Sequence, residues 1–187
     1  NGLGDCGDAA AEKLRICQAK NPERKRVYDE PNRLLQKVPT ENFTATKQVK
    51  FVPRKNKGKT VEGERAGLVV MGLDYAVLAL ESRADGIYLV QAACAKADKG
   101  GVEKENTAIK LDSDELYLRV KVKQTTRKPT QKPDYKCECT FYYSLDGKKY
   151  EPIGKTFTAK ESKWIGPKVG LICTHPWKRH DSGWPEP

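Results

Sequence analysis

The chain has 187 residues, of which 37% are hydrophobic and 32% are charged. A chain of this length buries an adequate core without disulfide bonds, as one large domain or, less favourably, two small ones. No run of about 18 apolar residues occurs, so the sequence excludes a membrane-spanning helix.

The formal net charge of +10 raises the question of an anionic partner. Basic residues cluster at Arg24–Arg26, at Arg54–Lys59 and from Lys121 to Lys132, in segments rich in Pro, Gly or polar residues. Such segments are typical of solvated loops. A nucleic-acid surface would interleave aromatic rings with the basic residues, and here the rings lie mostly elsewhere. We therefore favour loop charge over a nucleic-acid footprint.

The six cysteines are too few for a disulfide scaffold in a chain of this length. Cys137 and Cys139 are two residues apart in a predicted strand, so both point to the same side and cannot easily bond each other. Cys94, Cys139 and Cys173 end or interrupt apolar runs, where cysteine behaves as a small hydrophobic residue. We interpret them as buried thiols rather than disulfides, and no Cys-x-x-Cys spacing indicates a zinc site.

The first third of the chain contains one clear strand. Residues 1–12, rich in Gly, Asp and Ala, are predicted to be irregular, and short strands are predicted over Lys13–Gln18 and Arg33–Val38. From Phe43 to Val52 apolar and polar residues alternate, which indicates a strand with one face in water. A polar loop from Pro53 to Gly63 follows.

The stretch from Arg65 to Cys94 predicts three consecutive strands, over Ala66–Met71, Tyr75–Glu81 and Ile87–Cys94. Asp85-Gly86 is the kind of pair found in hairpin loops. The first two strands are apolar at nearly every position, so both of their faces must be hidden from water. One face belongs to a sandwich core, and the other needs a cover from this chain, another domain or a ligand.

The second half continues with strands separated by turns and by a polar loop at Ala95–Gly101. The predicted strands are Glu103–Leu111, Leu116–Val122, Tyr135–Leu145, Lys149–Ile153 and Lys168–Cys173. Leu116–Val122 alternates most strictly, with Tyr117 and Arg119 on the outward side. Asp146-Gly147 carries the strongest hairpin signal of the chain.

No segment shows an i, i+3, i+4 apolar pattern over three turns, so helix is at most incidental. About ten strands of even length predict an all-β fold, namely a two-sheet antiparallel β-sandwich of the jelly-roll type. We expect the sandwich to occupy residues 13–175, followed by a Trp- and Pro-rich tail at residues 176–187.

Several separate motifs occur in one order along the chain. They are Pro31–Lys37, Glu41–Thr44, Gly63–Ala76, Ala97–Gly101, Leu116–Val120, Tyr143–Gly147, Pro152–Gly154, Phe157–Thr158 and Trp164–Leu171. Together they resemble the C-terminal, concanavalin A-like β-sandwich of bacterial glycoside hydrolase family 43 enzymes. The resemblance is specific because so many motifs keep one succession.

That resemblance implies enzymes of the β-xylosidase and α-L-arabinofuranosidase type, which act on plant cell-wall xylan. Their catalytic site lies in a separate propeller domain with acidic residues, and the sandwich packs against it. A chain of 187 residues is too short to hold that propeller as well, so a catalytic domain is the implied partner. We also expect a bacterial protein of the periplasm or extracellular space, whose signal peptide lies outside this sequence.

Glycoside cleavage normally needs two carboxylates about 5 to 10 Å apart, one acting as acid and the other as base or nucleophile. No predicted strand carries such a pair, since Glu138 stands alone and the acids of residues 112–115 flank a turn. His175 and His180 lie at the end of the predicted sandwich and in the tail, and no Ser or Cys sits in a nucleophile elbow. We therefore expect no catalytic residue in this chain.

Carbohydrate binding is the remaining chemistry, because sugar rings pack on exposed aromatic rings while polar side chains bond the hydroxyls. The candidates for carbohydrate binding or domain docking are Asp74, Tyr75, Tyr117, Arg119, Tyr142, Trp164, Trp177 and Trp184. At each position a packing role is the alternative to ligand binding. Tyr142 and Trp164 could pack in the core or at a domain interface, and Trp177 and Trp184 could anchor the tail on the sandwich. Tyr75 and Val77, with no predicted cover, also fit a docking surface for a catalytic domain.

We interpret the chain as a non-catalytic ancillary domain of a family 43-like glycoside hydrolase, which packs on a catalytic domain and contacts xylan or arabinoxylan. A stand-alone carbohydrate-binding protein is the alternative, and a basic interaction module is a more distant one. We expect no cofactor, and a structural Ca²⁺ stays open because no acidic loop nominates its ligands.

Overall fold

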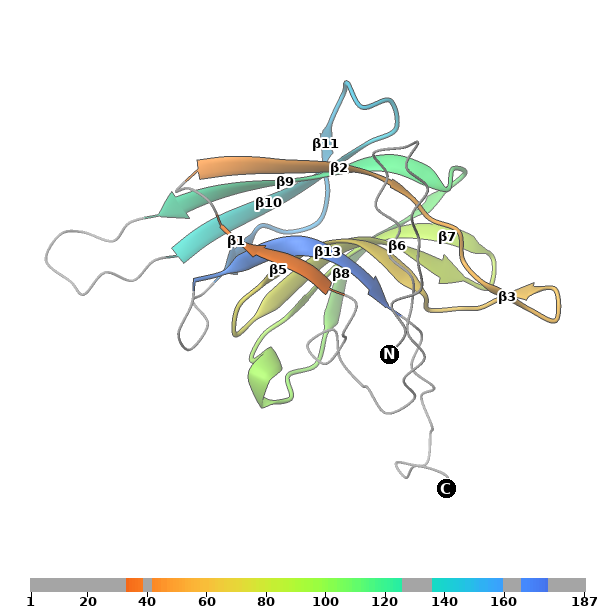
Figure 1. Cartoon of the computed structure of the whole chain (residues 1–187), viewed down its shortest axis with the longest axis horizontal. Helices are drawn as coiled ribbons and strands as arrows, with labels where there is room; N and C mark the ends of the chain where they lie inside the picture. The colour runs from red at the N-terminus through yellow and green to blue at the C-terminus, as the bar shows by residue number, and fades with distance from the viewer. Residues whose placement is uncertain (1–32, 39–41, 126–135, 160–165, 175–187) are drawn as a thin grey trace, which may run out of the picture.

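Two antiparallel β-sheets stacked face to face form the described part of the chain (Figure 1). The computed structural model describes residues 33–38, 42–125, 136–159 and 166–174. Strands account for most of these residues, so the predicted all-β sandwich is confirmed. Within these ranges no helix is long and apolar enough to cross a membrane. The predicted segments 1–12, Lys13–Gln18 and 176–187 lie outside the described residues.

The larger sheet has six strands and contains the three central strands predicted from the sequence. In spatial order its strands are β1 (Arg33–Lys37), β13 (Lys168–Thr174), β5 (Arg65–Met71), β6 (Tyr75–Arg83), β7 (Gly86–Cys94) and β8 (Lys104–Leu111). β5, β6 and β7 are consecutive antiparallel neighbours, and the predicted Asp85-Gly86 turn joins β6 to β7.

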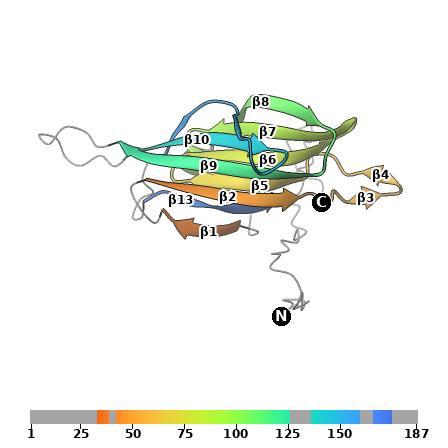
Figure 2. The same ribbon diagram turned by 90° about the horizontal axis from the view of Figure 1, so that it is seen from above.

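The smaller sheet lies over the larger one (Figures 1 and 2). Its strands are, in spatial order, β11 (Glu151–Pro152), β10 (Lys136–Ser144), β9 (Glu115–Thr125) and β2 (Asn42–Lys50), with β12 (Phe157–Ala159) also paired to β10. The register places Arg119 of β9 between Thr46 of β2 and Tyr142 of β10. Side chains therefore form rows that cross three neighbouring strands.

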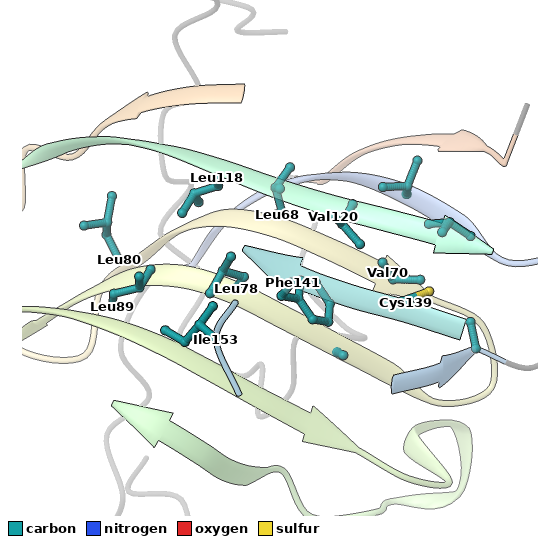
Figure 3. Packing of buried hydrophobic residues seen from close by; sticks show 14 of the residues in the cluster. Leu68, Val70, Leu78, Leu80, Leu89, Leu118, Val120, Cys139, Phe141 and Ile153 are labelled. Carbon is teal, nitrogen blue, oxygen red and sulfur yellow. The ribbon is translucent and has the colours of Figure 1, made fainter. Parts of the chain in front are cut away.

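The core lies between the sheets and is built from the alternate side chains that the strand period predicts. Leu118 and Val120 of β9 and Phe141 of β10 meet Leu78 of β6, and all four are 0% exposed (Figure 3). Fully burying a large apolar side chain contributes roughly 1.5–3 kcal/mol, so this contact between the sheets is a main source of stability.

The polar loop predicted after β2 contains a short hairpin. β3 (Lys55–Asn56) pairs with β4 (Lys59–Thr60), and the hairpin extends from one end of the sandwich (Figures 1 and 2). The two residues between them, Lys57 and Gly58, have φ angles of 50° and 81°, which a tight two-residue hairpin turn requires. The hairpin was not predicted within this polar loop; glycine at the second turn position lets the chain reverse within two residues.

A buried carboxylate fixes the base of this hairpin. Glu64 is 1% exposed and accepts bonds from the Arg54 backbone N–H at 2.7 Å and from Arg54 Nε at 2.5 Å. The backbone N–H of Glu64 in turn donates to Ser82 Oγ at 3.1 Å. A charged residue is therefore part of the interior at this end of the fold.

Two other turns differ from the prediction. The loop after β7 contains a short 3₁₀ helix, η2 (Ala97–Lys99). The Asp146-Gly147 pair does not form a two-residue hairpin, because β10 ends at Ser144 and β11 begins only at Glu151. The intervening residues form a wider loop whose backbone N–H groups bond to the Asp146 side chain.

Four cysteines lie in the described residues, namely Cys94, Cys137, Cys139 and Cys173, and all four are buried. The predicted burial is confirmed for these four. Cys137 and Cys139 both face the core, as their spacing predicts. Burial raises the pKa of the Cys139 thiol to about 12, so this thiol stays protonated at neutral pH.

Candidate functional site

The five predicted site residues that the structure describes come from both sheets, on opposite sides of the sandwich. Asp74 and Tyr75 lie at the start of β6, whereas Tyr117, Arg119 and Tyr142 come from β9 and β10. The remaining candidates lie outside the described residues; they are Trp164, Trp177 and Trp184.

We call the outer surface of the larger sheet the sealed face, because most of its side chains are buried. It consists of Arg65, Val69, Met71, Tyr75, Val77, Glu81, Arg83, Tyr88, Val90, Ala92 and Ile172. Val69, Val77 and Val90 are 0% exposed. The prediction that both faces of the central strands are hidden from water is therefore confirmed.

The expectation of an exposed ring at Tyr75 is wrong. Tyr75 is 1% exposed and belongs to one apolar cluster with Met71, Val77 and Ala97. Its hydroxyl donates to Glu103 at 2.8 Å. Burial, together with the charge of the Glu103 carboxylate, raises the pKa of Tyr75 above its usual value. Tyr75 and Val77 were expected to form an exposed docking surface, but both side chains are buried.

Asp74 serves the fold of the neighbouring turns. It is 8% exposed, and its carboxylate accepts the backbone N–H of Lys96 at 2.7 Å. Its backbone carbonyl accepts the N–H of Gly72 at 2.8 Å. The bond from Lys96 ties the turn between β5 and β6 to the loop after β7, so this covered carboxylate serves the fold.

A ladder of ion pairs, not predicted from the sequence, crosses the sealed face. Arg65 binds Glu81 and, at 2.5 Å, Glu103. Arg83 binds Glu81 at 2.7 Å and Glu105 at 2.5 Å. Burial acts to lower the pKa of Arg65, but the charges of Glu103 and Glu81 outweigh it and raise that pKa. These ion pairs could not be predicted from the sequence, because they depend on the strand register that places Arg65 opposite Glu81.

We call the outer surface of the smaller sheet the open face. Its side chains are all at least partly exposed and comprise Asn42, Thr44, Thr46, Gln48, Lys50, Glu115, Tyr117, Arg119, Lys121, Lys123, Glu138, Thr140, Tyr142 and Tyr150. The register aligns Tyr142, Arg119 and Thr46 in one row. The next row contains Tyr117 opposite Gln48. Three candidates predicted at separate positions of the sequence therefore share one surface.

Stacking and hydrogen bonding hold the cations of the open face in place. The Arg119 guanidinium lies 3.4 Å from the centroid of the Tyr150 ring, and its Nε donates to Thr46 Oγ1 at 2.8 Å. Lys121 Nζ lies 4.9 Å from the centroid of the Tyr142 ring. Each such contact contributes about 0.5–1 kcal/mol at an exposed site. Tyr150 was not predicted, because it lies in a loop whose return over β9 depends on the fold.

The loop after β10 covers one side of Tyr117. The Asp146 carboxylate organises this loop by accepting the backbone N–H groups of Lys148 and Lys149 at 2.8 and 2.9 Å. Those bonds lower the pKa of Asp146 to about 2. A Cβ atom at Gly147, which has a φ of +73°, would lie only 2.9 Å from the Tyr117 ring. Tyr117 is therefore half-buried beneath a glycine.

Among the described residues, Arg119, Lys121 and Lys123 of the open face lack the acidic partners that the arginines of the sealed face have, whereas Lys50 lies 4.0 Å from the Glu115 carboxylate. In the described ranges, no carboxylate forms an ion pair with Arg119, Lys121 or Lys123. The residues opposite Lys121 on the neighbouring strands are Thr44 and Thr140, which are neutral. The open face thus presents positive charge beside tyrosine rings.

No group of three or more His, Cys, Asp or Glu side chains that could hold a metal ion occurs in the part of the chain that the structure describes. Glu81 and Glu103, which converge on the sealed face, are both bound to Arg65. The structural Ca²⁺ left open by the sequence thus has no set of ligands among these residues.

One protein family matches almost the whole chain. Its description is the beta-xylosidase C-terminal concanavalin A-like domain, and it matches residues 9–184. A comparison with curated proteins finds no match.

Three solved structures share the fold. One is a GH43 glycoside hydrolase engineered at its active site to display endo-xylanase and exo-arabinofuranosidase activity, with a TM-score of 0.57 and 17% identity over 78% of this chain and 28% of that chain. A bifunctional GH43-CE protein of Bacteroides eggerthii has a TM-score of 0.55 and 17% identity over 82% of this chain and 20% of that one. A GH43_12 protein retrieved from a capybara gut metagenome has a TM-score of 0.52 and 16% identity, over 76% and 27% of the two chains.

The chain covers only 28%, 20% and 27% of the lengths of these three solved proteins. At identities of 16–17% they show a common fold. The family match is more specific, because it extends over residues 9–184. This chain therefore belongs to the family of beta-xylosidase C-terminal concanavalin A-like domains, and it is an ancillary domain of the family 43-like glycoside hydrolase type.

Proposed function

We propose that this domain serves a glycoside hydrolase that breaks down xylan or arabinoxylan, and that its open face contacts the polysaccharide. The observation that carries this proposal is the convergence of Tyr117, Arg119 and Tyr142 on one partly exposed surface. One solved relative displays endo-xylanase and exo-arabinofuranosidase activity, which supports a xylan-type substrate for the enzyme that this domain serves.

The open face offers both kinds of contact that a sugar needs. A tyrosine ring packs on the C–H face of a sugar ring, and adjacent polar groups bond its hydroxyls. Tyr142 supplies a ring, and Arg119 and Thr46 lie beside it in the same row. Gln48, in the next row, adds an exposed amide. An extended sugar chain laid across the strands would meet these groups in succession.

Cleavage of the polysaccharide is assigned to a separate catalytic domain on which this sandwich packs. Support comes from the small share of each solved relative, at most 28%, that the chain covers. We place the enzyme in the bacterial periplasm or outside the cell, because a cell-wall polymer is met there.

A titration with xylo-oligosaccharides tests the sugar contact. By isothermal titration calorimetry we expect saturable binding to the chain, and a roughly tenfold loss of affinity in Tyr142→Ala. Tyr88→Ala is the matched control, since Tyr88 also lies beside a cation, Arg83 at 4.6 Å, but on the sealed face. Equal affinity of Tyr142→Ala and the unsubstituted chain would contradict the proposal. Binding that occurs only after a family 43-type catalytic domain is added would leave packing as the sole role.

A further inference from the structure

We infer that the open face selects polysaccharide chains that carry uronic acid groups, with Arg119 as the ligand of the uronate carboxylate. The inference rests on the proposed sugar contact and adds the chemical class of the sugar. It starts from an imbalance of charge between the two outer faces of the sandwich.

Arginines on the two faces have different partners. On the sealed face, Arg65 and Arg83 each bind two carboxylates. On the open face, Arg119 uses Nε to bond the neutral hydroxyl of Thr46 and stacks on the ring of Tyr150. Neither contact neutralises the guanidinium. Its charge is therefore available to an outside anion, and a guanidinium edge binds a carboxylate through two parallel hydrogen bonds.

The same contacts fix the orientation of the Arg119 side chain before any ligand arrives. Stacking at 3.4 Å on Tyr150 and the 2.8 Å bond to Thr46 restrain both the plane and the position of the guanidinium. Arginine otherwise loses much rotamer freedom on binding, so a side chain already held in place binds a ligand at a lower entropic cost.

A second cation extends the positive region along β9. Lys121 lies two residues from Arg119 on the same side of the strand, which places the two Cα atoms about 6.6 Å apart. Its neighbours across the strands, Thr44 and Thr140, carry no charge. Further along, Lys123 lies opposite Glu138, so the excess positive charge is centred on Arg119 and Lys121.

The arrangement around Arg119 fits a sugar better than a bare anion. Tyr142 is the direct cross-strand neighbour of Arg119. Neighbouring strands lie about 4.7–4.9 Å apart, close to the width of a sugar ring. A uronic acid residue packed on Tyr142 therefore brings its carboxylate to the guanidinium, while a neutral xylose at the same place leaves the charge unmatched.

A comparison of ligands tests the inference on the unsubstituted chain. Affinities are measured by calorimetry for two xylo-oligosaccharides of equal length, one of them with a glucuronic acid substituent. We expect the acidic ligand to bind about tenfold more tightly, because a charge-assisted bidentate contact adds to the same stacking. Chemical reduction of the uronate to the alcohol should remove the difference, and raising the salt concentration should shrink it.

The outcomes separate this inference from the proposed function. Equal affinity for both oligosaccharides overturns the uronate selection and leaves the sugar contact intact. Absence of binding to both overturns the two together. Polyglutamate or single-stranded DNA bound as tightly as the acidic oligosaccharide also overturns the inference, because the open face would then be a general polyanion site.

Substitutions test the role of the guanidinium. Arg119→Lys keeps the charge and loses the planar donor edge, so we expect the preference for the acidic ligand to fall about threefold to tenfold. Lys99→Gln, at an exposed lysine of η2, is the matched control and should keep the full preference. A preference that Arg119→Lys and Arg119→Gln both retain would exclude Arg119 as the carboxylate ligand.

Discussion

The two outer faces of the sandwich both carry arginine and tyrosine, yet these residues have opposite roles. On the sealed face, Tyr75 is 1% exposed and Arg65 is bound by two carboxylates. On the open face, Tyr142 is partly exposed, and among the described residues Arg119 has a hydroxyl and a ring as its partners. On the sealed face the arginine charge is neutralised within the fold, whereas no carboxylate among the described residues neutralises Arg119 on the open face.

The difference shows that residue type alone does not identify a binding surface. The cross-strand neighbours of an arginine distinguish the two faces, because they determine whether its charge is neutralised inside the protein. Arg65 lies opposite Glu81, while Arg119 lies opposite Thr46 and Tyr142. Substitutions made in pairs, one on each face, test this difference directly.

The largest contrast is expected from a new lysine on each face. Val77→Lys places an unpaired charge at a position that is 0% exposed, and we expect a loss of roughly 3–5 kcal/mol in the free energy of unfolding. Thr44→Lys, at an exposed position of the open face, should change it by less than about 0.5 kcal/mol. Urea denaturation measures the free energy of unfolding of both variants. A Val77→Lys variant as stable as the unsubstituted chain would show that water reaches the sealed face.

Loss of an arginine should have the next largest effect. Arg65→Met leaves Glu103 without its guanidinium in a largely buried site, so we expect a destabilisation of about 2–4 kcal/mol, reduced by the 18% exposure of the arginine side chain. Arg119→Met should cost less than about 1 kcal/mol, because it removes only surface contacts. Similar costs for the two variants in urea denaturation would contradict the assignment of Arg65 to the fold and Arg119 to a ligand.

Removing a tyrosine hydroxyl is expected to have a smaller effect. Tyr75→Phe deletes the 2.8 Å bond to the Glu103 carboxylate inside the protein, which should cost about 1–2 kcal/mol. Tyr142→Phe keeps the ring on a partly exposed surface and should alter stability by less than about 0.5 kcal/mol. Thermal and urea unfolding of the two variants can be compared directly, and an equal loss in both would remove the distinction between the faces.

The smallest effect concerns pH and the loop beside Tyr117. The pKa of Asp146 is lowered to about 2 in the folded chain, against about 3.9 in an unfolded one. Its stabilising contribution is therefore present above about pH 4 and is lost as the pH falls towards 2. Urea denaturation at several pH values should show the free energy of unfolding of the unsubstituted chain approaching that of Asp146→Asn as the pH falls over that range. A difference that stays constant with pH would show that the carboxylate does not stabilise the loop.

Residue periodicity alone predicted most of the long strands and the side to which each of their side chains points. Alternation at Leu116–Val122 predicted which side chains of β9 face the core, because successive side chains on a strand point to opposite faces. The unbroken apolar runs of β5 and β6 predicted that the outer surface of the larger sheet is hidden as well. The two-residue spacing of Cys137 and Cys139 likewise predicted that both face one side.

Which outward side chains stay exposed depends on the folded arrangement of distant segments. Tyr75 and Tyr117 both lie on outward positions of their strands, yet one is buried with Glu103 and the other is half-covered by Gly147. Tyr150 stacks on Arg119 because a loop returns over β9. The strand period is local, whereas burial and charge pairing depend on register and on segments far away along the chain. Sequence periodicity therefore predicts the face of a side chain and leaves its neighbours undetermined.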